Sequence, residues 1–148
     1  MTDTPATAAR LGLERHPEGG WFRRTWTAAT TVETPAGPRP TATGIHYLLT
    51  PGEDSAWHVV TSDELWLWHG PGALDLRLGG DGMRPVDDAD AVHVTLGADL
   101  ASGNAAQFLV EAGTWQSARL VGTDEVLVSC VVSPGFSFDD WKLASEPL

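Results

Sequence analysis

The chain has 148 residues, 42% of them hydrophobic and 20% charged, which is the size and composition of one globular domain with a substantial core. Its net charge of −11 disfavours nucleic acids and anionic membranes as partners, because such a surface repels phosphate groups. The single cysteine, Cys130, cannot form an internal disulfide, and the apolar run VLVSCVV around it indicates a buried structural residue. We expect a cytoplasmic protein, since the first twenty residues lack the apolar segment of a secretory signal and no run approaches membrane-spanning length.

A short helix is predicted at the start, with Thr4 as its N-cap and Pro5 at its first position, ending before His16. After the Gly19-Gly20 turn, nearly every segment has the pattern of a strand, and only residues 31–41, TVETPAGPRPT, read as a proline-rich loop. The predicted strands cover residues 21–27, 44–50, 55–60, 64–70, 73–78, 91–96, 106–112, 114–121 and 125–132, and FSFDDWKL (136–143) follows a Pro-Gly turn. Alternation in residues 73–78 directs Leu74, Leu76 and Leu78 inward and Asp75 and Arg77 outward.

Short strands separated by turn signals indicate an antiparallel sandwich or barrel, with no internal repeat and no domain boundary in residues 1–148. The loop GGDGMRPVDDAD (79–90) lacks the ligand spacing of a calcium loop and is expected to be a solvated connection. Neither a GxSxG elbow, a P-loop, a GxGxxG loop, a CxxC pair nor an HExxH helix is present. Any active site must therefore be assembled from side chains on strands.

The stretch SAWHVVTSDELWLWHG (55–70) carries the most specific pattern in the chain. Gly52, His58, Glu64 and Gly70 resemble the first motif of the cupin superfamily, and VEAGTWQSARL (110–120) resembles the second. The segments HPEGGWF (16–22), HYLLTPGEDSAWH (46–58), SDELW (62–66), AGTWQSA (112–118) and SPGFSFDDW (133–141) are similar to one branch of that superfamily. Its members are small stand-alone cupins of largely unassigned function, similar in fold to deoxysugar epimerases.

The resemblance implies an all-β fold, an antiparallel double-stranded β-helix or jelly roll, with two sheets that enclose a pocket. A two-residue turn at Ser62-Asp63 would put His58 and Glu64 on opposite faces of a hairpin, whereas a three-residue connection would pair Val60 with Glu64. Cupin geometry requires the second register. We therefore expect one face to line the pocket with these residues: His58, Val60, Glu64, Trp66 and Trp68.

Metal-binding cupins hold their ion with three histidines and one glutamate, and this chain departs from that set. Val60 occupies the second histidine position and Gln116 the third, which leaves His58 and Glu64 as good ligands. His46 could complete a set of two histidines and one carboxylate for Fe, Zn, Mn or Ni if its side chain points inward. If it points outward, a metal site has very little support.

Two residues are expected to carry the chemistry, and each has a structural alternative. His58 is the candidate base, or else a hydrogen-bonded core histidine. Glu64 is the candidate acid or orienting group, or else the partner of Arg77 or Arg119 in an ion pair. Burial would raise the pKa of Glu64 and a protonated His58 would lower it, and the sequence leaves open which effect is larger.

The remaining candidates are expected to bind the substrate, although the tryptophans are also ordinary core residues. They are His46, Trp66, Trp68, Trp115 and Gln116. Five other residues are expected to be structural or solvated: His16 in a turn, His69 and His93 facing outward, and Asp139 and Asp140 closing the C-terminal turn.

Three functions are compatible with these residues. The first is a non-redox enzyme of the epimerase, isomerase or dehydratase type, which moves protons on a sugar-like or carbonyl compound. The second is a metal-dependent oxygenase or isomerase that uses His46, His58 and Glu64. The third is a non-catalytic module that binds a small metabolite. The resemblance also implies a homodimer.

Overall fold

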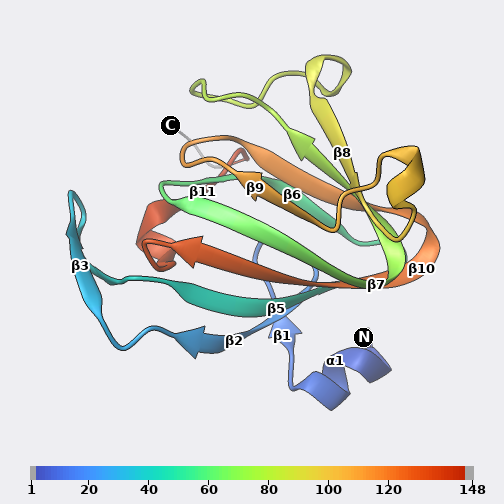
Figure 1. Ribbon diagram of the computed structural model, residues 1–148, viewed down its shortest axis with the longest axis horizontal. Helices are drawn as coiled ribbons and strands as arrows, with labels where there is room; N and C mark the ends of the chain where they lie inside the picture. The colour runs from blue at the N-terminus through green and yellow to red at the C-terminus, as the bar shows by residue number, and fades with distance from the viewer. Residues whose placement is uncertain (1–2, 146–148) are drawn as a thin grey trace.

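The computed structural model describes residues 3–145 and shows nine strands in one continuous hydrogen-bonded sheet, which bends into two antiparallel halves, the first and second sheets, packed face to face (Figure 1). The elements are α1 (Ala6–Leu11), β1 (Glu14–Arg15), β2 (Trp21–Thr27), β3 (Thr31–Thr34), β4 (Gly37–Pro40), β5 (Thr43–Leu49), β6 (Asp54–Val60), β7 (Asp63–Leu78), the 3-10 turn η1 (Asp88–Asp90), β8 (Val92–Leu96), η2 (Leu100–Ser102), β9 (Gln107–Val110), β10 (Gln116–Ser133), η3 (Phe138–Asp140) and β11 (Trp141–Leu143). This arrangement confirms the predicted jelly roll with a short N-terminal helix.

Two long strands, β7 and β10, belong to both sheets because each bends near its middle. Where Asp63–Pro71 of β7 pairs with Val126–Ser133 of β10, the first sheet continues through β5, β2 and β1 on one side and β9 on the other. Where Ala73–Leu78 of β7 pairs with Gln116–Val121, the second sheet continues through β6 and β11 on one side and β8 on the other. The sequence predicted four separate strands here, since turn residues stand at both bends. The structure shows instead two continuous strands that change sheets.

The expected hairpin between β6 and β7 is wrong. Val60 pairs with Trp141 of β11, and Glu64 pairs with Val110 of β9 and Val132 of β10, so the two strands lie in different sheets. The turn after β9 lies against the connection, where Gly113 N donates to Val60 O and Ala112 N donates to the Asp63 carboxylate. His58 and Glu64 nevertheless face each other, because they line the inner sides of opposing sheets.

Three smaller expectations also need correction. Residues 31–40, expected to be a loop, form the β3–β4 hairpin, which projects from the barrel (Figure 1). Helix α1 begins after Pro5 and shows no side-chain cap. Arg77, expected in solvent, is buried on the outer side of β7, where it contacts Trp57 and pairs with Asp88.

The core lies between the sheets and is built from the inward positions of β5, β7, β8, β9 and β10. Its members include Leu49, Leu74, Leu76, Leu96, Val110, Val126 and Val128. Their burial supplies the main stabilisation of the barrel, since each buried aliphatic side chain contributes about 1.5–3 kcal/mol. None of the helical segments in residues 3–145 is long and apolar enough to cross a membrane.

Candidate functional site

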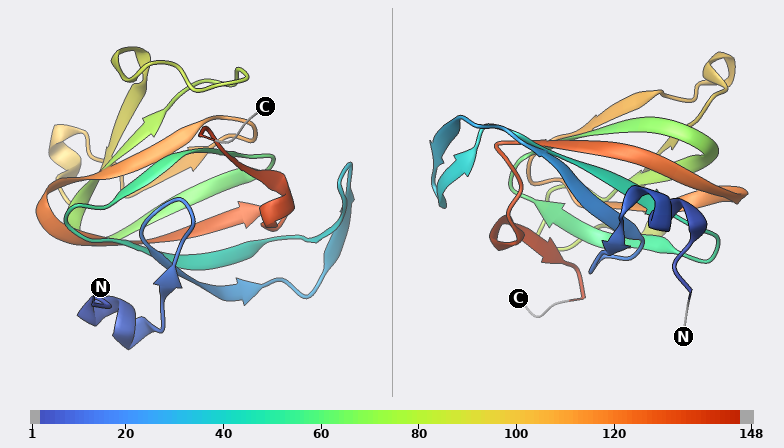
Figure 2. Two further views of the ribbon diagram at one scale, coloured as in Figure 1. Left: turned by 180° about the vertical axis from the view of Figure 1, so that it is seen from behind. Right: turned by 90° about the horizontal axis from the view of Figure 1, so that it is seen from below.

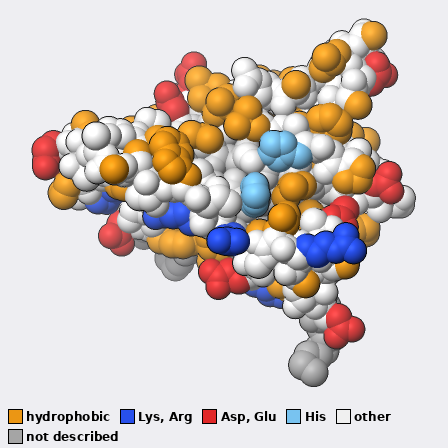
Figure 3. All heavy atoms as spheres, turned by 60° about the horizontal axis from the view of Figure 1, so that its bottom comes forward, with side chains coloured by type: hydrophobic (Ala, Val, Ile, Leu, Met, Phe, Trp, Pro, Cys, Tyr) orange, Lys and Arg blue, Asp and Glu red, His pale blue; other side chains and the backbone are white. Residues whose placement is uncertain are grey.

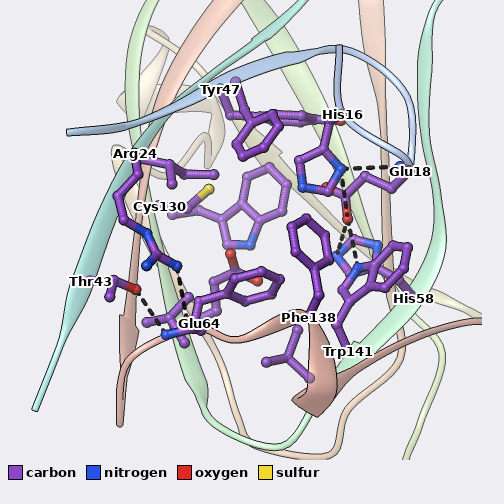
Figure 4. A pocket seen from close by; sticks show the side chains of 16 residues that line it. His16, Glu18, Arg24, Thr43, Tyr47, His58, Glu64, Cys130, Phe138 and Trp141 are labelled. Carbon is purple, nitrogen blue, oxygen red and sulfur yellow. Dashed lines mark hydrogen bonds and ion pairs between the residues drawn. The ribbon is translucent and has the colours of Figure 1, made fainter. Parts of the chain in front are cut away.

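The barrel is open at one end and contains a cavity of about 280 Å³ between the two sheets (Figure 4). The loop between β1 and β2 and the C-terminal segment that carries η3 and β11 lie at this end (Figure 2). The cavity is lined by His16, Glu18, Phe22, Arg24, Thr43, Ile45, Tyr47, His58, Val60, Glu64, Trp66, Cys130, Val132, Phe136, Phe138 and Trp141. Most of this wall is aromatic or aliphatic, so the few polar side chains in it are candidates for chemistry.

His58 is buried on the inner side of β6, and both of its ring nitrogens have partners. Nδ1 lies 2.7 Å from the Ala56 carbonyl oxygen, which can only accept, so this nitrogen carries the hydrogen. Nε2 lies 3.2 Å from a carboxyl oxygen of Glu18. Burial lowers the pKa of His58, although Glu64 and the Ala56 carbonyl oppose this effect. The imidazole is therefore neutral at pH 7 unless it takes the proton that it shares with Glu18.

Glu18 reaches the cavity from the loop between β1 and β2. Its backbone carbonyl accepts from Ala56 N at 2.7 Å, and its carboxyl accepts from Trp141 Nε1 at 3.2 Å. Next to it, Gly19 has a φ of 108°, and an added Cβ would lie 2.0 Å from the Asp54 carbonyl oxygen. Only glycine fits there, because the left-handed conformation and the close backbone both exclude a side chain. Burial raises the pKa of Glu18 to about 8 despite the hydrogen bond from Trp141.

Glu64 lies on β7, and the side-chain amide of Gln116 orients its carboxyl group. Gln116 Nε2 donates to a carboxyl oxygen of Glu64 at 2.8 Å, and Gln116 Oε1 accepts from Trp66 Nε1 at 2.9 Å. Burial raises the pKa of Glu64 to about 7, and His58 opposes the rise. Of the two effects expected on Glu64, burial is therefore the larger. Neither Arg77 nor Arg119 pairs with it; both arginines lie near Asp88 instead.

His16 also lines the cavity, which the sequence did not indicate. Its Nδ1 accepts from the Glu18 backbone N–H at 3.1 Å, so His16 stabilises the turn in which it was expected to lie. Burial and the neighbouring His58 lower its pKa to about 3, which keeps it neutral. Its ring packs edge-on against Phe22 at 4.5 Å and against Tyr47 at 5.7 Å.

The structure brings together only some of the predicted substrate-binding residues. Trp66 lines the cavity, and Gln116 lies directly behind Glu64. Trp68 and Trp115 lie outside the cavity, with their indole nitrogens bonded to the carbonyls of Gly72 and Gly82. His46 also lies outside, because Ile45 and Tyr47 take the inward positions of β5. The predicted pair Asp139-Asp140 is structural, as Asp140 pairs with Arg39 at 2.8 Å.

The main omission of the sequence analysis is Glu18. HPEGG indicated only a turn and the resemblance, and no spacing rule connects Glu18 with His58, forty residues further on. A signal was present all the same, since an acid directly before two glycines in a strand-rich chain indicates a special turn. The cavity-lining role of Arg24, Tyr47, Phe138 and Trp141 has no comparable signal, because it depends on which way each strand faces.

The donor groups do not fit a tightly held metal ion. Val60 and Gln116 stand where metal-binding cupins have histidines, and the amide nitrogen of Gln116, not its oxygen, faces Glu64. His58 Nε2 is directed at Glu18, and His46 lies outside the cavity. In residues 3–145, no three histidine, cysteine, aspartate or glutamate side chains are grouped as a metal site requires.

The family is decided by comparison with known proteins. A family model described as Cupin superfamily (DUF985) matches residues 6–144. The chain belongs to the cupin superfamily. This cupin is similar to a solved protein of Shewanella oneidensis, at 34% identity and a TM-score of 0.82, over 97% of this chain and 85% of the other. It is also similar to a hypothetical protein from Leishmania major, at 30% identity and a TM-score of 0.81, over 91% and 83% of the two chains.

More distant structures share the fold alone. The oxalate decarboxylase of Lactobacillus farciminis matches this cupin at 24% identity and a TM-score of 0.56, over 87% of this chain but only 32% of the enzyme. No curated protein matches the chain. The chemistry of this cupin must therefore be argued from its own cavity, since fold does not determine function.

Proposed function

We propose that this cupin is a non-redox enzyme that transfers protons on a small carbonyl-containing or sugar-like molecule, as epimerases and isomerases do. The observation that carries the proposal is the enclosure of two carboxyl groups and an imidazole in one largely apolar cavity. General acid–base catalysis works best with pKa values near the operating pH. Burial gives Glu64 a pKa of about 7 and Glu18 a pKa of about 8, which meets this condition.

The two carboxyls take different roles in this proposal. Glu64 is the more acidic, so its ionised fraction accepts the proton of a C–H bond next to the carbonyl group. Glu18 and His58 share a proton across their 3.2 Å contact, and this pair supplies a proton to the carbonyl oxygen. The expectation that His58 alone is the base is thereby modified, because its available nitrogen already faces Glu18.

The surrounding residues hold these groups in place. Gln116 orients Glu64, and the Ala56 carbonyl fixes the tautomer of His58. Phe22, Phe138 and Trp141 supply aromatic surface against which a sugar ring or a planar group can pack.

Solvent-hydrogen exchange tests the proposal and does not require the natural substrate. A panel of small carbonyl compounds and reducing sugars is incubated in D₂O with the protein, and deuterium incorporation is followed by NMR. We expect exchange at a carbon next to the carbonyl for some panel members, and a loss of about 10²-fold or more in Glu64→Gln and in His58→Gln. His93→Gln, on the exposed outer side of β8, is the matched control and retains the wild-type rate.

Two results would replace the proposal. Tight binding of a metabolite that survives both substitutions, with no exchange in any compound, would make the protein a binding module. Stoichiometric Fe, Zn, Mn or Ni in the purified protein, with activity lost on chelation, would support a metal-dependent cupin.

A further inference from the structure

One charged group of the cavity has no part in the proton transfer described above. Arg24 lies on the inward side of β2, beside Ile45, and its guanidinium reaches the rim of the cavity (Figure 4). Its Nη2 donates to the Phe136 carbonyl oxygen at 2.9 Å, which places the guanidinium beside the C-terminal segment. A guanidinium has five N–H donors, so one hydrogen bond leaves most of them available.

Arg24 is an exposed residue, and two less exposed arginines of this acidic chain have carboxylate partners. Arg39 pairs with Asp140 at 2.8 Å and Arg77 with Asp88 at 3.0 Å. Within residues 3–145, no carboxylate forms an ion pair with Arg24, although the chain has 20 acidic residues and only nine lysines and arginines. The cavity therefore has an unpaired cation at its entrance.

The rest of the cavity is suited to an anion with an apolar body. Glu18 is protonated and the two histidines are neutral near pH 7, so Arg24 is the one permanently charged side chain among the lining residues. Aromatic rings from Phe22, Phe138 and Trp141 line the same cavity. A volume of about 280 Å³ accommodates a molecule with one ring and a short side chain.

We infer that the substrate is a small carboxylate with a carbonyl group next to an ionisable C–H bond, and that Arg24 binds its carboxylate. The inference rests on the proposed function and adds the substrate class to it. Arginine is suited to this role because its planar fork can hold a carboxylate through two parallel hydrogen bonds.

Phenylpyruvate is a suitable probe, since it has a carboxylate, a ketone and an aromatic ring. Glu64 takes a proton from C3, and the electrons of that C–H bond form the double bond between C2 and C3. The carbonyl π electrons move to the oxygen, which takes the proton shared by Glu18 and His58. The product is the enol, and the reverse reaction in D₂O places deuterium at C3.

The test compares two neighbouring arginines on opposite faces of one strand. Arg24→Gln and Arg23→Gln remove the same charge, but Arg23 faces outward and bonds the Leu11 carbonyl. Binding of phenylpyruvate and of its uncharged methyl ester is measured by calorimetry at constant ionic strength, with circular dichroism to confirm folding. We expect the acid to bind about 10- to 100-fold more weakly to Arg24→Gln, and equally well to wild type and Arg23→Gln. The ester should show no such difference between the proteins.

The outcomes separate this inference from the function on which it rests. Three results would each overturn the carboxylate site. They are equal affinities of Arg24→Gln and Arg23→Gln for the acid, equal affinities of the wild type for acid and ester, and no binding of the acid. Arg24-dependent binding without exchange at C3 would support the site and remove the proton-transfer function. Exchange at C3 of phenylpyruvate that is unaffected by Arg24→Gln, with equal affinity for the acid, would keep the function and overturn the site.

Discussion

Two buried glutamates determine how the cavity behaves. Glu18 and Glu64 are each exposed by less than a tenth, and neither has an arginine or lysine partner among the described residues. A buried carboxyl of this kind retains its proton to a higher pH, because ionisation in an apolar site is costly. At pH 7 the folded protein thus has a largely protonated Glu18 and a partly ionised Glu64 next to a neutral imidazole.

The stability contributed by the protonated Glu18 and Glu64 should fall as the pH rises. Both pKa values are raised from 4.5, to about 8 for Glu18 and about 7 for Glu64. Below pH 4.5 the folded and unfolded chains both hold these protons, so the stabilisation is fully present. Between pH 4.5 and about 8 the unfolded chain releases them first, so this contribution to the free energy of unfolding decreases, while the lowered pKa values of His16 and His58 act in the opposite direction below pH 6.5.

Glu18→Gln removes one of these titrating groups while it can preserve the hydrogen bonds. We expect the variant to match the wild type at pH 5 and to exceed it by about 1–3 kcal/mol at pH 8, measured by urea unfolding at both values. Glu14→Gln, an exposed position on β1, is the control and should change neither value. If the free energy of unfolding of Glu18→Gln varied with pH in the same way as that of the wild type, the raised pKa of Glu18 would be contradicted.

Gln116 couples Glu64 to Trp66 and should be important for stability as well as for orientation. Gln116→Ala leaves two buried groups without their partner, which we expect to cost about 2–4 kcal/mol. Denaturant unfolding measures this, with Gln107→Ala on the exposed side of β9 as the control. A cost no larger than that of the control would show that water replaces the amide.

At the scale of elements, the loop between β1 and β2 delivers Glu18 to the cavity. Its geometry depends on Gly19, which stands so close to the Asp54 carbonyl that a Cβ does not fit. The C-terminal segment closes the other side through Trp141, whose indole donates to Glu18. Chain segments from the two ends of the sequence therefore meet at one carboxyl group.

A pair of glycine substitutions separates steric exclusion from backbone strain. Gly19 and Gly52 both have positive φ, at 108° and 88°, but an added Cβ at Gly52 meets nothing within 4 Å. We expect Gly52→Ala to cost about 1 kcal/mol and Gly19→Ala about 3 kcal/mol or more, measured by thermal unfolding. Exchange activity should fall in Gly19→Ala alone. Similar losses of stability in Gly19→Ala and Gly52→Ala would mean that the loop between β1 and β2 can shift to accommodate the added Cβ.

The sequence predicted strands well and their partners poorly. Alternation located residues 21–27 and the inward leucines 74 and 76, because this signal is local. The resemblance placed His58 and Glu64 in one cavity, although through a hairpin that does not exist. Neither approach could show that β7 and β10 pass from one sheet to the other, or that Glu18 reaches His58, since both facts depend on long-range pairing.

At the scale of the whole molecule, the outer face of the first sheet carries an apolar patch. Leu65 and Leu67 of β7 point outward beside Leu109 of β9, which is 46% exposed, and Val131 of β10 lies opposite Leu65. Figure 3 shows hydrophobic side chains close together on one face of the molecule, with histidines among them. Such a patch is typical of a protein–protein interface, and we propose that a second copy of the chain covers it.

Light scattering after size exclusion tests the dimer. We expect a particle of twice the 15.8 kDa chain mass, and a monomer in the double variant Leu65→Lys, Leu109→Lys. Val92→Lys, an exposed position on β8 in the other sheet, should remain dimeric. A wild-type monomer at micromolar concentration, or a dimer unaffected by the double variant, would assign the patch another role.

The proposed chemistry depends most on two cavity carboxyls whose pKa values lie near neutral pH, so that Glu64 can accept a proton and Glu18 can supply one. Carbon NMR of protein labelled at the glutamate carboxyls measures this directly, with Glu18→Gln and Glu64→Gln to assign the two signals. We expect apparent pKa values near 8 and 7, which move together because the groups interact. If both carboxyls titrate between pH 4 and 5, as exposed glutamates do, the proposed proton transfer is wrong.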